Sequence, residues 1–210
     1  MKLKLKLLAL SLATVGFSSV QAQGISDDII RIGHITDMSG VYSDLDGTAG
    51  TEAIKMAVAD LGGEIDGKKI EVVGFDHQNK ADIASAKARE WIDQDKVDII
   101  FGGTNSATAL AVAAVAAEKK IPYIQLGAGS TQLTNEQCTP FTIHYAYNTK
   151  ALANVTGSAV VQEGGNDWFF VTADYAFGHS LEKDTATVVK ASGGNIKGQV
   201  RVPLSTTDFT

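Results

Sequence analysis

The sequence predicts an α/β protein made of two doubly wound, parallel-sheet lobes, the second of them incomplete. Apolar strand-like segments alternate with helix-like segments through almost the whole chain, which is typical of parallel sheets with right-handed crossovers. After Thr134 the pattern loosens, and a second strand–helix series begins near residue 145. We therefore divide the chain into an export signal (residues 1–22), a first lobe (residues 23–145) and the start of a second lobe (residues 146–210).

The first 22 residues have the composition of an export signal. Three lysines lie among the first six residues, an apolar run covers residues 7–15, and Val20-Gln21-Ala22 resembles a signal cleavage site. The apolar run is too short for a membrane-spanning helix, which needs roughly 20 apolar residues. Cleavage after Ala22 is expected to release the protein into the periplasm without membrane insertion, and no cysteine follows that site to carry a lipid.

The chain is acidic, with a formal net charge of −6. Loss of the three signal lysines takes this value to −9, because the signal contains no acidic residue. An acidic chain without a basic run argues against nucleic acid or an anionic membrane as a partner. Cys138 is the single cysteine, so a disulfide within the chain is excluded.

The first lobe is expected to begin with two strand–helix pairs. They comprise strands at residues 29–35 and 69–75 and helices at residues 48–61 and 81–94. The first helix ends at Gly62-Gly63, and its predicted apolar face consists of Ile54, Ala57, Val58 and Leu61. The second helix has the spacing of a buried stripe, formed by Ala84, Ala88, Trp91 and Ile92.

Residues 97–130 are the most informative part of the chain. They predict a strand (97–101), a loop (102–106), a helix (107–118), a strand (121–126) and a second loop (127–130). Both loops follow parallel strands, and the first also opens a helix whose free N–H groups attract anions. Neither loop contains a Lys, Arg, His, Asp or Glu. We therefore expect these loops to hold a small carboxylate through backbone N–H and hydroxyl groups, without catalysis.

The second lobe is expected to repeat the alternation. After a short alternating segment at residues 141–146 come a helix (149–162), a strand (168–172), a helix (179–191) and a strand (196–202). The loop at residues 173–178 carries two aromatic rings, which suit an apolar ligand body. The first lobe contributes three strand-end loops, at residues 36–47, 102–106 and 127–130. They would face the aromatic loop across a cleft, where ligand pockets are common.

Three other chemistries have weak support in the sequence. Gly102-Gly103 is not followed by the lysine and hydroxyl residue of a phosphate-binding loop. Asp174, His179 and Ser180 lie close in sequence, whereas a catalytic triad is assembled in space, and no G-x-S-x-G elbow is present. The histidines lack metal-ligand spacing. We therefore predict neither a catalytic residue nor a metal site.

The individual histidines are likewise not expected to bind a metal. His34 lies inside an apolar strand and is expected to be a hydrogen-bonded core residue. Asp76-His77 is expected to lie in a solvated loop, and His144 to be a packed residue at the crossover between the lobes.

Five segments resemble the periplasmic substrate-binding proteins of branched-chain amino-acid-type ABC transporters. These proteins are leucine-binding-protein-like and have the type I periplasmic binding protein fold. The segments are IRIGHITDMSGVYSDLDG, AIKMAVADLGG, GKKIEVVGFDHQNKADIA, GGTNSATALAVAAVAAEKKIPYI and VTADYAFGHSLEKD, and the likeness runs from Ile29 to Thr210. The resemblance implies a cofactor-free binding protein whose two lobes close on a small ligand and deliver it to an ABC permease of the inner membrane.

The resemblance has two further implications. Members of the family are usually nearly twice as long, and the additional chain returns to complete the first lobe and supplies an acidic residue for a ligand amine. We therefore expect this chain to be a fragment of a longer receptor, with the returning segment of the first lobe absent. The same fold also serves in ligand-sensing receptors and regulatory domains, which is the alternative function.

The resemblance places ligand contacts at eleven positions: Tyr42, Ser43, Thr104, Asn105, Ser106, Gly127, Ala128, Gly129, Ser130, Tyr175 and Phe177. Ser106 matches the serine whose hydroxyl and neighbouring N–H hold the ligand carboxylate. Gly129 replaces a threonine and Phe177 a tyrosine, so two hydroxyl groups that would serve a ligand amine are missing. A less polar carboxylate, such as an aromatic or aliphatic acid, is therefore a hypothesis of equal standing with a branched-chain amino acid.

Overall fold

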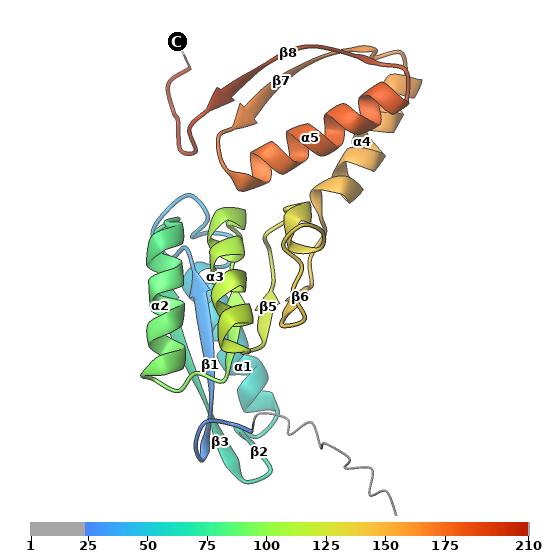
Figure 1. The fold of residues 1–210 in the computed structure, drawn as a ribbon. Helices are drawn as coiled ribbons and strands as arrows, with labels where there is room; N and C mark the ends of the chain where they lie inside the picture. Colours follow the sequence, from blue (N-terminus) through green and yellow to red (C-terminus); the bar gives the residue numbers. More distant parts are fainter. Residues whose placement is uncertain (1–23, 210) are drawn as a thin grey trace, which may run out of the picture.

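The computed structural model describes residues 24–209, so the expected export signal lies outside the described residues. Within them, strands and helices alternate in the predicted α/β arrangement (Figure 1). The elements in chain order are β1 (Ile29–Thr36), α1 (Gly47–Asp60), β2 (Glu64–Ile65), β3 (Lys68–Asp76), α2 (Ala81–Asp93), β4 (Ile99–Gly102), α3 (Ser106–Lys119), β5 (Tyr123–Gln125), the 3-10 turn η1 (Thr131–Leu133), β6 (Thr142–His144), α4 (Thr149–Gln162), β7 (Asp167–Ala173), α5 (Ala176–Ala191) and β8 (Asn195–Val202).

Six strands form the larger sheet, in the order β2-β3-β1-β4-β5-β6. Five of them run parallel, and β2 pairs antiparallel with β3. The turn between β2 and β3 is Asp66-Gly67, where both residues have positive φ angles of 52° and 75°, as a tight hairpin turn requires. Because the other strands share one direction, the loops after β1, β3, β4 and β5 emerge at the same edge of the sheet.

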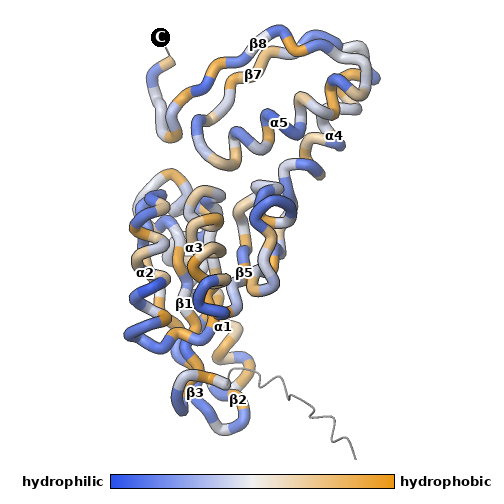
Figure 2. Tube along the Cα trace, viewed as in Figure 1, coloured by the Kyte–Doolittle hydropathy of each residue, from blue (hydrophilic) through white to orange (hydrophobic). Residues whose placement is uncertain are grey.

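Helices α2 and α3 cover one face of this sheet (Figure 1), and Figure 2 shows that α3 is largely hydrophobic. The predicted stripe of α2 is buried at Ala84, Ala88 and Trp91. The buried face of α3 consists mainly of small residues, among them Ala109, Val112, Ala113 and Ala116. Small side chains let the two helices pack closely against each other and the sheet, which fixes the position of the first turn of α3.

The prediction for the apolar face of α1 is partly wrong. Leu61 is 69% exposed and Ala57 is also exposed, whereas Thr51 is buried. The cause is His34 on β1, whose Nδ1 lies 2.8 Å from the Thr51 hydroxyl oxygen. This bond turns the Thr51 side of the helix toward the sheet and leaves Leu61 near solvent. His34 is itself fully buried, so the prediction of a hydrogen-bonded core histidine is confirmed.

Strands β7 and β8 form a second, parallel sheet that packs against α5, and α5 in turn packs against α4 (Figure 1). The bounds of α4 are those predicted, and its first turn is capped by Asn148, which accepts a hydrogen bond from the N–H of Ala151 (2.9 Å). α5 begins three residues earlier than predicted because Gly178 lies inside the helix. A Cβ at Gly178 would overlap the carbonyl oxygen of Ala173, so this glycine permits close packing on the end of β7.

Candidate functional site

A small cavity lies where the strand-end loops of the larger sheet face the start of α5. Its volume is about 120 Å³, and its lining residues are Tyr42, Leu45, Thr104, Gly127, Gly129, Tyr147, Tyr175 and Phe177. They come from the loops after β1, β4 and β5, the segment between β6 and α4, and the junction of β7 with α5. Ligand pockets are common between packed units of this kind, and the volume restricts an occupant to a small molecule.

Four aromatic rings dominate the lining. The ring centroids of Tyr42 and Tyr175 lie 6.4 Å apart, and those of Tyr175 and Phe177 lie 6.2 Å apart. The hydroxyl groups of Tyr42 and Tyr175 form a hydrogen bond between the two sheet units. Burial raises the pKa of both phenols, so both are neutral hydrogen-bonding groups at physiological pH.

Gly129 lies beneath two of these rings. A Cβ built on this glycine would stand 2.9 Å from Cε2 of Phe177 and 3.0 Å from Cε2 of Tyr147. Carbon atoms in van der Waals contact are farther apart, at about 3.5–4.0 Å. Any larger residue at position 129 would therefore have to displace an aromatic ring, which gives a physical reason for a glycine at this position.

The first turn of α3 supports the opposite wall. Asn105 is the N-cap, and its side-chain oxygen accepts hydrogen bonds from the N–H groups of Ala107 (2.8 Å) and Thr108 (3.2 Å). Ser106 is fully buried, and its hydroxyl oxygen accepts a hydrogen bond from the N–H of Ser130 at 3.2 Å. Thr104, which directly precedes this N-cap, lines the cavity.

The predicted site residues thus occupy two layers. Those that line the cavity are Tyr42, Thr104, Gly127, Gly129, Tyr175 and Phe177. Those that are buried behind it are Asn105, Ser106, Ala128 and Ser130. Ser43 lies outside the lining, where its hydroxyl donates to the carbonyl oxygen of Gly40 (2.8 Å) and closes the loop after β1.

Two lining residues were missed by the sequence reasoning, Leu45 and Tyr147. Leu45 was part of the loop already singled out after the first strand. Tyr147 follows the short strand β6 and precedes the N-cap of α4. Tyr147 stands just before the start of a helix, as Tyr175 does. This similarity could have indicated Tyr147 as a lining residue.

Hydroxyl contacts behind the cavity join the two sheet units. The Ser130 and Ser180 hydroxyl oxygens lie 2.6 Å apart in a buried contact. Asp184 on α5 accepts hydrogen bonds from the hydroxyl groups of Thr149 (2.6 Å) and Thr131 (3.0 Å). His144 Nε2 lies 2.6 Å from the carbonyl oxygen of Ala128, so this histidine is a packed residue at the crossover, as interpreted.

The prediction that Asp76-His77 lies in a solvated loop is wrong for His77. Its side chain is 1% exposed, and its Nε2 lies 3.1 Å from the hydroxyl oxygen of Thr108. Asp76 is half-buried and accepts hydrogen bonds from the N–H of Met38 (3.0 Å) and the hydroxyl of Ser39 (2.6 Å). The loop after β1 packs over this segment, a contact that the sequence does not display.

The residues considered for catalysis do not form a triad. His179 pairs with Asp174 at 2.7 Å on the surface, whereas the hydroxyl of Ser180 points to Ser130. Within residues 24–209, no group of three or more His, Cys, Asp or Glu side chains is placed to hold a metal ion. In the same range, no helix is long and apolar enough to cross a membrane.

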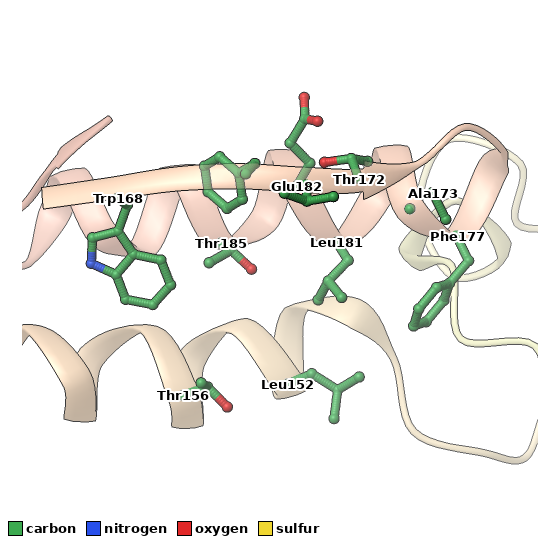
Figure 3. A pocket seen from close by; sticks show the side chains of 12 residues that line it. Leu152, Thr156, Trp168, Thr172, Ala173, Phe177, Leu181, Glu182 and Thr185 are labelled. Carbon is green, nitrogen blue, oxygen red and sulfur yellow. The ribbon is translucent and has the colours of Figure 1, made fainter. Parts of the chain in front are cut away.

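A larger hollow of about 460 Å³ lies between α4, β7 and α5. Figure 3 shows Trp168 and Leu181 pointing toward α4, whereas the carboxylate of Glu182 points away from that side. All its lining residues come from the second sheet unit and its helices, and Phe177 is the one that it shares with the small cavity. The strand-end loops of the larger sheet contribute nothing to it, so we assign the ligand site to the small cavity.

The family described as periplasmic binding protein matches residues 29–210. A curated relative, Leu/Ile/Val-binding protein homolog 6 of Brucella abortus, is 23% identical over 203 residues, which cover 96% of this chain and 51% of that protein. The chain therefore spans about half the length of the curated relatives it matches.

Two solved structures are similar as well. A periplasmic binding protein from Burkholderia mallei is 66% identical with a TM-score of 0.85, over 87% of this chain and 48% of that chain. A solute-binding protein of an ABC transporter from Rhodopseudomonas palustris BisB5, in complex with 3,4-dihydroxybenzoic acid, is 30% identical with a TM-score of 0.77, over 87% of this chain and 50% of that chain. These similar proteins are binding proteins, not enzymes.

Proposed function

Because the chain belongs to the periplasmic binding protein family, we propose that it captures a small carboxylate outside the cytoplasm and delivers it to an ABC permease. Membership in this family supports a role in transport, an extracytoplasmic location and binding without catalysis. The ligand and the delivery step are our proposal for the whole protein, since the chain spans about half of its relatives' length.

The aromatic lining of the cavity is the observation that carries the choice of ligand. Four of the eight lining residues are aromatic, and the eight include no Lys, Arg, His, Asp or Glu. A flat aromatic body can stack on these four rings, whereas a branched aliphatic side chain gains only apolar contact there. We therefore favour an aromatic carboxylate over a branched-chain amino acid.

The lining also contains hydroxyl groups that can bind the polar parts of such a ligand. Thr104 offers a hydroxyl group two residues before the start of α3, and the helix dipole favours a negative charge near that end. The hydroxyl groups of Tyr42 and Tyr175 belong to two further lining residues and can bind ring substituents. The similar protein from Rhodopseudomonas palustris holds 3,4-dihydroxybenzoic acid, which has this combination of charge, ring and hydroxyl groups.

Calorimetric titration of the complete protein with 3,4-dihydroxybenzoate, benzoate and leucine tests the proposal. We expect the aromatic acids to bind and leucine to bind about tenfold more weakly, because leucine has no ring to stack on the aromatic lining and such ring pairs contribute about 0.5–1.5 kcal/mol beyond burial. Tight binding of leucine with none of the aromatic acids would overturn the ligand choice.

A pair of tyrosine variants locates the site. Tyr147→Ala removes a ring from the lining and should weaken binding of the aromatic acids by about tenfold or more. Tyr145→Ala removes a ring that is 78% exposed two residues away, and it should bind as the unmodified protein does. Equal affinities of the two variants would place the ligand elsewhere.

Delivery to a permease is tested by uptake of labelled acid in cells with and without the gene.

A further inference from the structure

Three neighbouring strand-end loops are joined by the side chains of Asp37 and Asn105, which are buried, and Asn79, which is half-buried. They follow β3, β1 and β4, which are adjacent in the sheet. The carboxylate of Asp37, which is 1% exposed, accepts hydrogen bonds from the N–H groups of Gly40 (2.8 Å) and Tyr42 (2.9 Å). It also accepts a hydrogen bond from Nδ2 of Asn79 in the loop after β3. The conformation of the loop that carries Tyr42 is therefore set by Asp37.

Asn79 extends this contact to the third loop. Its Oδ1 accepts a hydrogen bond from Nδ2 of Asn105 at 3.0 Å, and the Oδ1 of Asn105 caps the first turn of α3. One amide side chain thus uses its donor on the loop after β1 and its acceptor on the loop after β4. Asn79 has a φ of 57°, a left-handed conformation that asparagine and aspartate adopt more readily than most residues.

A second route runs in parallel through His77. The N–H of Asn79 donates to Nδ1 of His77 at 3.1 Å, so the ring proton lies on Nε2 and is donated to the Thr108 hydroxyl oxygen at 3.1 Å. That hydroxyl donates to the carbonyl oxygen of Asn105 at 2.9 Å. Both routes connect the loop after β3 with the first turn of α3.

The loop after β1 fits tightly over these groups. A Cβ on Gly40 would stand 2.7 Å from Nδ2 of Asn79 and 2.7 Å from Oδ2 of Asp37. Such a distance leaves no room for a side chain at position 40. A shift of Asn79 would therefore be transmitted to the loop that carries Tyr42.

We propose that Asn79 is a positioning residue for the ligand site: it sets the position of Tyr42 through Asp37 and that of Thr104 through Asn105. Asp37, Asn79 and Asn105 do not line the cavity, whereas Tyr42 and Thr104 do. The effect on ligand affinity rests on the proposed function, but the coupling between the loops does not.

Asn79→Asp is the sharpest test. The substitution keeps the size of the side chain and its tolerance of a positive φ, but it replaces the donor to Asp37 with a carboxylate oxygen. Gln78→Glu is the matched control, because Gln78 is the exposed neighbour, also has a positive φ of 52°, and receives the same additional charge. Both variants are made in the full chain.

Amide hydrogen exchange measures the coupling without a ligand. In Asn79→Asp we expect the N–H groups of Gly40 and Tyr42, and those of Ala107 and Thr108 on α3, to exchange about tenfold faster or more. The N–H of Ile100 in the core strand β4 should be unchanged, and Gln78→Glu should behave as the unmodified chain. Faster exchange at Gly40 and Tyr42 with unchanged exchange at Ala107 and Thr108 would overturn the proposal.

Affinity for 3,4-dihydroxybenzoate provides the second readout. It should fall about tenfold in Asn79→Asp, and Asn105→Asp should cause a similar loss, because it retains the helix cap and removes the donor to Asn79. Asn79→Asp cuts the bond to Asp37 and Asn105→Asp cuts the bond to Asn79. Because the two bonds act in series through residue 79, the double variant should lose less than the sum of the two single losses; additive losses would contradict the coupling. If 3,4-dihydroxybenzoate binds none of these proteins, the proposed function fails, and the exchange measurement still decides the positioning role. If Asn79→Asp does not fold, the exchange and affinity measurements are made on Asn105→Asp instead.

Discussion

The ring of Phe177 lies over Gly129 so closely that a Cβ on the glycine would stand 2.9 Å from its Cε2. These two residues are 48 positions apart and belong to different sheet units. Their contact joins the loop after β5 to the first turn of α5 and closes one side of the cavity. The absence of a side chain at position 129 is therefore a condition for the aromatic wall.

Gly129→Ala should weaken ligand binding. The added methyl group must displace Phe177 or Tyr147, and overpacking of this kind costs about 1–3 kcal/mol, so we expect about a tenfold loss of affinity for 3,4-dihydroxybenzoate by calorimetry. Phe177→Leu removes the ring that stands nearest to the added methyl group. In a Phe177→Leu background, Gly129→Ala should therefore cause little further loss of affinity. Unchanged affinity of the single variant would show that the wall does not contact the ligand.

The hydrogen bond between the Tyr42 and Tyr175 hydroxyls predicts energetic coupling between the two sheet units. Tyr42→Phe and Tyr175→Phe each remove the same bond and leave both rings in place. The double variant should therefore be less destabilised than the sum of the two, by about 1 kcal/mol in the free energy of unfolding measured in urea. Additive losses would mean that the hydroxyls do not interact in solution.

Asp184 is expected to contribute to stability through the hydroxyls of Thr131 and Thr149. Thr149 is fully buried, so Asp184→Asn, which weakens a charge-assisted acceptor, should lower the free energy of unfolding by about 1–3 kcal/mol. Asp174→Asn is the control, because Asp174 forms an exposed pair with His179 and exposed pairs contribute about 0–1 kcal/mol. The same loss in both variants would contradict a special role for Asp184.

The sequence predicted most of the fold because its signals are local. Gly62-Gly63 after α1 and the spacing of Ala84, Ala88 and Trp91 describe short stretches of chain, and each element they indicate is present. The start of α5 was missed because Gly178 was interpreted as part of a loop, although it serves close packing inside the helix.

The site was less predictable because its contacts join distant residues. The strand-end position placed Thr104 and Gly129 near one edge of the sheet, and both line the cavity. The burial of His77 depends on Thr108, 31 residues away, and the role of Asn79 depends on Asp37 and Asn105, which lie 42 and 26 residues away. Such pairs follow from the order of strands in the sheet, which local patterns do not encode.

The burial of His77 predicts that stability depends on pH. Burial lowers its pKa from 6.5 to about 4; the nearby carboxylates of Asp37 and Asp76 oppose this shift, and His34 adds to it. Between these values the unfolded chain binds a proton more readily than the folded chain, so stability rises with pH through this range. The contribution of His77 is complete above pH 6.5 and is lost as the pH falls to about 4, and it amounts to roughly 3 kcal/mol.

Urea unfolding at pH 7 and at pH 4.5 measures this effect. His77→Asn retains an acceptor for the N–H of Asn79 but does not titrate, so the difference in unfolding free energy between the two pH values should shrink. His179→Asn is the control, because His179 is partly exposed and pairs with Asp174 on the surface, and it should keep the full difference. An unchanged pH dependence in His77→Asn would show that protonation of His77 does not oppose folding. The buried hydrogen bonds from Asn79 through His77 to Thr108 would then have to accommodate a charged imidazole ring.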